Sequence, residues 1–364
     1  MFYRPAKAYI NLPALRHNLA IAKSLAPNSK VLAVVKANGY GHGICRVVQQ
    51  LVGADGFGVA SIDEALLLRQ KGFLHRILLL EGLFSEIELP LAVQNRLDIV
   101  VHSMHQLQWV LRYQTALVIN IWLKIDTGMH RLGFAIEEVP TVIQQLKQNS
   151  NSFNIHLMSH LASADERTAT AVEFTKQQIK SFNRTTEAFD FPKSLHNSAG
   201  LQSYGSACYD WVRPGILLYG IGSVHTPFDK QAQLKPVMRL ESAVIAIRWI
   251  EAGEFVGYGN DWQAPKKTCV AVIAIGYGDG YPRHAPTGTP VLVEGKRVSL
   301  IGRVSMDMIT VDITKYHERI HIDSLATLWG GEGLSVDEVA SYANTISYEL
   351  LCGITSRVPM IEIQ

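Results

Sequence analysis

The sequence predicts an α/β fold in which a (β/α)8 barrel of the TIM type is followed by a mostly antiparallel β domain. Two observations predict it. Short apolar runs alternate with helix-like stretches up to about residue 235, in steps of roughly 20 to 40 residues that suit βα units. From residue 236 onward, long runs rich in Val and Ile alternate with tight glycine-containing turns. With 364 residues, 48% of them apolar, the chain can bury both cores.

Eight candidate strands account for the barrel. Eight βα steps that close on themselves give a barrel of about 250 residues or slightly less. An open, doubly wound sheet is the alternative, because periodicity does not show closure. The eight apolar runs begin at residues 31, 56, 76, 97, 117, 154, 194 and 215.

Helix signals lie between the strand candidates. The segment 61–72 begins with the capping-box pair Ser61 and Glu64 and ends near Gly72, which predicts one of the barrel helices. Near the end of the chain, Ser335 and Glu338 form a second capping-box pattern and predict one short helix.

The second part of the chain has the alternation of antiparallel strands. Glu294 and Gly295 separate two apolar runs and predict a hairpin turn. We therefore expect a barrel domain over residues 1–235 and a β-rich domain over residues 236–364, with the first few residues free to pack with the second domain.

Composition excludes several classes of function. The 34 basic and 32 acidic residues leave a formal charge of +2 without a basic block, so we expect no nucleic-acid partner. The cysteines Cys45, Cys208, Cys269 and Cys352 have no C-x-x-C spacing, and no metal site is expected. Since no apolar run reaches about 18 residues and no signal peptide is recognisable, we expect a cytoplasmic protein without a membrane segment.

Lys36 is the first residue with a chemical signal. It ends the first apolar run and precedes the glycine-rich segment ANGYGHG. Barrel enzymes carry catalytic side chains at the carboxyl ends of their strands, and a partly desolvated lysine amine can form a Schiff base. Position alone does not separate this interpretation from a surface lysine beside a turn.

Sequence context separates them. The segment VVKANGYGHG resembles the pyridoxal-phosphate-binding signature of the alanine racemase family, and further matches keep that family's order along the whole chain. Eight matches in register are not chance. The others are KIDTGMHRLG (124–133), SHLASADE (159–166), HNSAG (196–200), VRPGILLYG (212–220), IGYGDGYPR (275–283), GRVSMDM (302–308) and ISYEL (346–350).

The resemblance implies a two-base racemase. Lys36 would hold pyridoxal phosphate as a Schiff base and then serve the D-face of alanine, while Tyr277 would serve the L-face. A free tyrosine has a pKa of about 10 and needs help to act as a base near neutral pH. The resemblance assigns this help to His160, bonded to the tyrosine, and to Arg213, bonded to His160 and to the pyridine nitrogen of the cofactor. Because a guanidinium cannot hand over its proton, we expect transamination to be rare.

The remaining matches imply binding roles. Arg131 and the backbone of Met306 correspond to groups that hold the substrate carboxylate, and Lys124 aligns with a lysine that is carbamylated in some members. Asn197 lies beside Ser198 in one strand-end loop. The residues that correspond to contacts with the cofactor phosphate are Tyr40, Ser198, Gly215, Ile216 and Tyr348.

Three rival functions are weighed against this prediction. A decarboxylase on the same plan would have a different carboxyl-terminal motif with a cysteine, whereas the IGYGDGYPR motif is intact here. A non-catalytic cofactor-binding barrel would lack the second domain. A cofactor-free aldolase would explain Lys36 but would leave Arg213 and Tyr277 without a role. The resemblance also implies a homodimer with shared active sites, which either supplies D-alanine for peptidoglycan or consumes it in catabolism.

Overall fold

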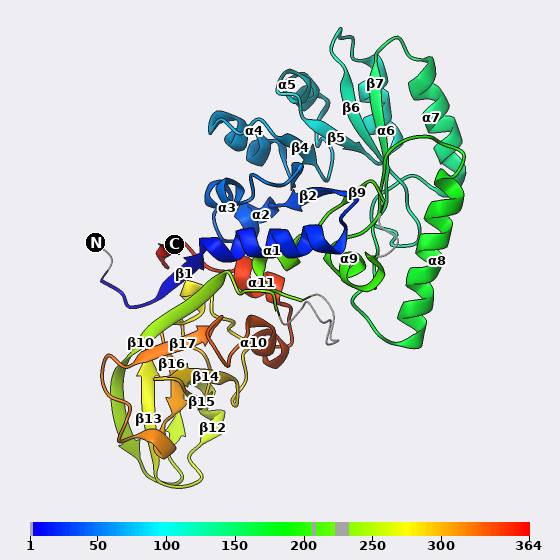
Figure 1. Cartoon of the computed structure of the whole chain (residues 1–364). Helices are drawn as coiled ribbons and strands as arrows, with labels where there is room; N and C mark the ends of the chain where they lie inside the picture. Colours follow the sequence, from blue (N-terminus) through cyan, green and yellow to red (C-terminus); the bar gives the residue numbers. More distant parts are fainter. Residues whose placement is uncertain (1–2, 206–208, 223–232) are drawn as a thin grey trace. The chain divides into compact units, whose positions relative to one another are not determined.

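The computed structural model describes residues 3–205, 209–222 and 233–364. Cys208 lies outside the described residues. By contacts, the chain forms two compact units (Figure 1). One comprises residues 15–39 and 43–234, and the other comprises residues 1–14, 40–42 and 235–364. Each unit is described by itself.

The first unit is a closed barrel of eight strands. Every neighbouring pair is parallel, and the last strand pairs with the first, so the prediction of a (β/α)8 barrel is confirmed and the open sheet is excluded. The strands are β2 (Lys30–Val34), β3 (Gly56–Val59), β4 (Arg76–Leu79), β5 (Asp98–Val101), β6 (Ile119–Lys124), β7 (Phe153–Met158), β8 (Lys193–Ser194) and β9 (Trp211–Val212).

The prediction of the eighth strand at residue 215 is wrong. The closing strand is β9, and the apolar run from Gly215 to Gly220 contains the 3-10 helix η4 (Ile216–Tyr219). Its Leu218 N–H donates to Gly215 C=O, and left-handed Gly220 ends it. An unbroken apolar run carries no period of its own, so a buried helical turn looks like a strand.

Helices connect the strands, and α7 and α8 lie outside β6 and β7 (Figure 1). The predicted helix at 61–72 is α4 (Ile62–Gln70), with Gly72 left-handed behind it. The Ser61 side chain makes no capping bond, so that half of the capping box is wrong: Glu64 instead accepts from the N–H groups of Ala60 and Asn38. The other helices are α1 (Leu12–Leu25), α2 (Lys36–Tyr40), α3 (Ile44–Gln50), η1 (Glu86–Glu88), α5 (Leu89–Gln94), α6 (Met104–Arg112), η2 (Ile136–Glu138), α7 (Val139–Gln148), α8 (Ala169–Thr186) and α9 (Ser198–Tyr204).

The barrel interior is filled by large side chains from six of its strands. They form one buried cluster: Leu32, Leu78, Val100, Trp122, Met158 and Trp211. A filled interior leaves the ends of the strands as the place where polar chemistry can be accommodated.

The second unit is built on an eight-stranded sheet that is antiparallel except for the β1–β18 pair. The predicted hairpin at Glu294–Gly295 is confirmed, since both residues have positive φ and Val293 pairs with Lys296. In sheet order the strands are β13 (Thr268–Ile273), β16 (Ile309–Asp312), β15 (Lys296–Leu300), β14 (Pro290–Val293), β17 (Leu325–Trp329), β10 (Met238–Ile250), β1 (Lys7–Asn11) and β18 (Met360–Ile363).

Short elements complete this unit. The predicted helix near the end is α10 (Val336–Tyr342), capped by Ser335, whose Oγ accepts from the Glu338 N–H. This prediction is confirmed, and a second short helix, α11 (Ser347–Cys352), follows α10. The rest are β11 (Phe255–Val256), η6 (Tyr258–Asn260), β12 (Trp262–Gln263), η7 (Tyr277–Asp279) and η8 (Thr314–Tyr316). Among the described residues, every helix is too short or too polar to cross a membrane.

Candidate active site

Lys36 lies two residues after the end of β2, just before the backbone turns left-handed. Ala37, Asn38 and Gly39 have φ values of 53°, 54° and 64°, and the Gly39 N–H donates to Val35 C=O at 2.8 Å. For L-residues such a conformation costs about 1 to 2 kcal/mol each, and it persists only where surrounding contacts hold it. Strain of this kind, next to a lysine at a strand end of a barrel, indicates a functional turn.

Arg213 is almost completely buried, with 3% of its surface exposed. Among the basic residues predicted for the site in the barrel unit, it is the most buried. Its Nη2 donates to the Ser159 carbonyl at 2.6 Å and to the Leu195 carbonyl at 3.3 Å, and Nη1 donates to the Ser194 hydroxyl. Burial lowers the pKa of this guanidinium to about 10, so it is still charged at neutral pH. Arg213 is therefore a fixed positive charge that can only donate.

His160, which follows β7, is neutral beside this charge. Burial and then the charges of Arg213 and Lys124 lower the pKa of His160 well below its ordinary value. Its Nδ1 lies 3.4 Å from Arg213 Nη2. Because the guanidinium cannot accept, Nδ1 must accept and Nε2 must carry the proton. His160 thus presents a single N–H donor.

Lys124, at the end of β6, shares the same cationic surroundings. It is buried, and burial together with the charges of Arg213 and Arg131 lowers the pKa of its amine to about 8. A narrow pocket is lined by Lys124, Arg131 and His160. Arg131 itself is exposed. This cluster of cations is suited to an anionic group.

Ser198 and the start of η4 lie together beyond the last two barrel strands. The Ser198 Oγ accepts from the Gly215 N–H at 2.8 Å and from the Leu217 N–H at 3.3 Å. Asn197 caps α9 by accepting from the Gly200 N–H at 2.9 Å. Leading N–H groups of a helical turn, such as that of Ile216, have no partner inside the helix and favour anions.

The second unit places Tyr277 in the turn η7, on top of another backbone segment. The Tyr277 N–H donates to Ser305 C=O at 3.0 Å, and the Gly278 N–H donates to Met306 C=O at 2.8 Å. A Cβ at Gly276 would lie 2.2 Å from the Ser305 carbonyl oxygen, so only glycine fits there. Tyr277 is 40% exposed, and its turn is hydrogen-bonded to the segment that carries Met306.

Tyr40 and Tyr348 also lie together in this unit. Their ring centroids are 5.8 Å apart. Burial, followed by the nearby Tyr348 and Cys352, raises the pKa of Tyr40, so its hydroxyl stays neutral and can donate. Gly41 lets this segment approach α11, since a Cβ there would lie 2.2 Å from Leu351 C=O.

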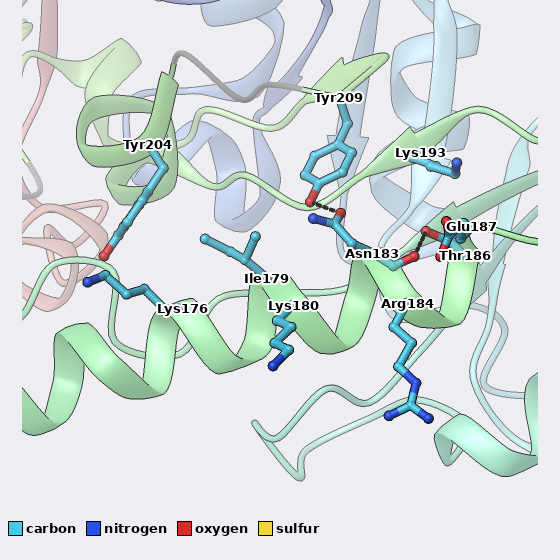
Figure 2. A pocket seen from close by; sticks show the side chains of 10 residues that line it. All are labelled: Lys176, Ile179, Lys180, Asn183, Arg184, Thr186, Glu187, Lys193, Tyr204 and Tyr209. Carbon is cyan, nitrogen blue, oxygen red and sulfur yellow. Dashed lines mark hydrogen bonds between the residues drawn. The ribbon is translucent and has the colours of Figure 1, made fainter.

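A groove of about 830 Å³ follows α8 on the barrel unit. In Figure 2 the Tyr209 hydroxyl donates to the Asn183 side chain at 2.6 Å, across the groove from the Tyr204 ring. None of the predicted site residues lines this groove. Its lining side chains are those of Lys176, Ile179, Lys180, Asn183, Arg184, Thr186, Glu187, Lys193, Tyr204 and Tyr209. Size alone therefore does not locate the reaction.

Two residues of the site escaped the sequence analysis. Ser194 accepts from Arg213 and lies two residues before the HNSAG match. Asp279, fully buried, lies inside the IGYGDGYPR match and accepts from Arg4 at 2.6 Å. The available signal for Asp279 was that it is the one acidic residue of this glycine-rich motif. Among the described residues there is no cluster of metal-ligating side chains.

Fold and site define the class: a two-unit protein with a (β/α)8 barrel, whose strand ends carry a lysine, a buried arginine and a neutral histidine. Residues 10–223 match the family model described as "Alanine racemase, N-terminal domain", and residues 237–362 match "Alanine racemase, C-terminal domain". The chain belongs to the alanine racemase family.

Similar proteins and similar solved structures are also alanine racemases. The alanine racemase of Coxiella burnetii is 47% identical over 365 residues, with 99% of each chain covered, and that of Vibrio cholerae is 47% identical over 358 residues, with 98% covered. The biosynthetic alanine racemase of Pseudomonas aeruginosa has a TM-score of 0.95 and 44% identity, over 99% of this chain and 100% of that one. The alanine racemase of Acinetobacter baumannii has a TM-score of 0.92 and 38% identity, with the same coverage.

Proposed function

We propose that this protein is an alanine racemase, which interconverts L-alanine and D-alanine with pyridoxal phosphate as its cofactor. Full-length similarity to alanine racemases supports this. The observation that carries the proposal is the pair formed by the buried Arg213 and the neutral His160, in the barrel whose strand β2 ends before Lys36.

The donor set fits that cofactor. When bound, pyridoxal phosphate supplies the electron sink that stabilises the charge left on the α-carbon after its proton is removed. Lys36 would hold the aldehyde carbon, and Arg213, which is buried and only donates, would face the ring nitrogen. The phosphate would be held by hydroxyl and N–H donors, namely Tyr40, Ser198, Gly215, Ile216 and Tyr348, with Asn197 in the same loop.

Proton transfer would use two groups on opposite faces of the substrate. Lys36 removes or returns the proton of D-alanine, and Tyr277 that of L-alanine. An N–H donor stabilises a phenolate, and the Nε2–H of His160 is the donor assigned to Tyr277. Arg213 keeps His160 in this tautomer and cannot pass a proton to the ring nitrogen, which disfavours transamination.

Binding of the substrate carboxylate is assigned to Arg131 and the backbone of Met306. Lys124 would support Arg131 after carbamylation, in which its neutral amine attacks CO2, a C–N bond forms and one proton leaves. The pKa of about 8 supports this step, because a sizeable fraction of the amine is neutral near pH 7.5. Signal from ¹³C-labelled CO2 in the wild type, and none in Lys124→Met, is the expected NMR result.

We further propose that the protein works as a homodimer in the cytoplasm. The catalytic pair is divided between the two units of the chain, and the family resemblance implies shared active sites. Sedimentation at assay concentration tests the association, and an active monomer would contradict it.

Racemisation measured in both directions tests the proposed function. We expect the purified protein with pyridoxal phosphate to convert each alanine enantiomer into the other. Lys36→Ala should abolish racemisation, and Tyr277→Phe should greatly reduce its rate. Borohydride should bleach the cofactor band of the wild type and label Lys36. Release of CO2 from a basic amino acid without racemisation of alanine would identify a decarboxylase instead.

A further inference from the structure

We propose that Asp279 is a positioning residue, which holds the Tyr277 turn in the place that proton transfer requires. This inference rests on the proposed function of Tyr277. It concerns contacts within one unit, and it assigns a role to a buried acid that the reaction described above does not use.

Asp279 is fully buried, yet its carboxylate lies among cations and a backbone donor. Its Oδ2 accepts from Arg4 Nη2 at 2.6 Å and from the Gly276 N–H at 3.0 Å. Its Oδ1 lies 3.3 Å from Arg357 Nε. Because a buried carboxylate is costly unless it is paired and hydrogen-bonded, these partners must stay in place around it.

The same cations reach the neighbouring segment, which carries Met306. Arg4 Nη2 donates to Asp307 C=O at 2.8 Å, and Arg357 Nη2 donates to Asp307 Oδ1 at 2.5 Å. Asp279 therefore connects the Tyr277 turn to the Met306 segment through two guanidinium groups. The amino-terminal segment takes part through Arg4.

Hydrogen bonds to neighbouring segments hold the turn on two sides, and the Asp279 carboxylate adds contacts of its own. On one side, Tyr277 and Gly278 donate to the Ser305–Met306 backbone. On the other, the Thr355 N–H donates to Asp279 C=O at 3.2 Å and its hydroxyl to Gly278 C=O at 2.9 Å. The Asp279 side chain also closes the turn on itself, by accepting from Gly276.

The Tyr277 side chain has less support of its own than Asp279 has, since Tyr277 is 40% exposed while Asp279 is fully buried. Its position follows from the backbone of a three-residue 3-10 turn, whose third residue is Asp279. A displacement of about 1 Å at a proton-transfer group can cost about 100-fold in rate. Loss of the carboxylate should therefore affect kcat more than KM.

The test is racemisation by Asp279→Asn, with Glu251→Gln as the matched control, since Glu251 pairs with Lys267 at an exposed site of the same unit. We expect Asp279→Asn to lower kcat about 10- to 100-fold, with KM within about threefold of the wild type. The control should match the wild type. Arg4→Ala, which removes one partner from the amino-terminal segment, should show a smaller loss of the same kind and serves if Asp279→Asn does not fold.

Deuterium isotope effects separate positioning from general damage. If the Tyr277 step becomes slower, the isotope effect on kcat/KM for [2-²H]-L-alanine should rise, while that for [2-²H]-D-alanine should fall or stay unchanged. A folded Asp279→Asn enzyme, or Arg4→Ala enzyme, with wild-type kcat and isotope effects would overturn the proposal, as would a rate loss in which both isotope effects change alike. A wild-type protein that does not racemise alanine would instead overturn the proposed function.

Discussion

Replacing Arg213 by lysine should damage both stability and catalysis, although the charge is conserved. The guanidinium has five N–H donors in a planar fork and here reaches Ser159, Ser194, Leu195 and His160. An ammonium group has three donors on a narrower head and cannot span this set. At least one of the two buried carbonyls should lose its donor.

The magnitude follows from those contacts. An unsatisfied buried polar group costs about 1 to 3 kcal/mol, so we expect the free energy of unfolding of the barrel to fall by about 2 to 4 kcal/mol. His160 should also lose its fixed tautomer. Racemisation should then fall by about tenfold or more, which corresponds to about 1.4 kcal/mol in the activation free energy.

Urea unfolding followed by tryptophan fluorescence measures the first effect, since Trp122 and Trp211 lie in the barrel core. Racemisation of L-alanine measures the second. Arg184→Lys, on the α8 groove, is the matched control and should behave as the wild type. An Arg213→Lys enzyme that loses less than about 1 kcal/mol and retains its full rate would refute the reasoning.

Three other predictions follow from the structure. Asp98→Ala should destabilise the barrel by about 3 kcal/mol in urea unfolding, because the substitution leaves the buried Trp122 N–H and Arg76 without their acceptor. Burial raises the pKa of Asp98, so the contribution of Asp98 to the free energy of unfolding should fall as pH rises past the ordinary aspartate range. Asp98→Asn should lack this pH dependence of stability. In CO2-free buffer, where Lys124 keeps its amine, Lys124→Met should be more stable than the wild type at pH 7 by about 3 kcal/mol, because the folded-state pKa of that amine is lowered to about 8 and the wild type gains stability only as pH rises from there toward about 10.5. Equal urea midpoints at pH 7 in that buffer would contradict this. Gly276→Ala should cut kcat about 100-fold, because the added Cβ meets a backbone carbonyl and must displace the Tyr277 turn, and an unchanged kcat would contradict it.

Alternation of apolar runs was sufficient to predict the βα units but not their closure into a barrel, because each parallel strand is buried on both faces and stands out as a short apolar segment whether the sheet is open or closed. It failed at the eighth strand, where β9 has only two residues and the more apolar run at 215–220 is a helical turn. The prediction that Ser61 and Glu64 form a capping box was wrong for another reason. Glu64 is engaged by the Asn38 N–H, a contact 26 residues away that no local pattern contains.

The residues of the candidate site also fall into those that the sequence revealed and those that only the structure revealed. Lys36 is visible from its place at a strand end, and Arg213 and His160 are visible only through the family resemblance, since single cationic residues carry no local signal. Ser194 accepts from Arg213, and Asp279 accepts from Arg4, which lies 275 residues away, and from the Gly276 N–H. Sequence patterns therefore pointed to the groups that we propose to face substrate, but not to the buried groups whose partners lie far away in the chain.

Exchange of the α-proton with deuterated solvent tests most directly whether two different groups serve the two faces. In Tyr277→Phe, we predict that D-alanine still exchanges its α-proton, because Lys36 is intact, while L-alanine does not. Equal exchange of both enantiomers by that variant would mean that residue 277 transfers no proton, and the two-base account would be wrong.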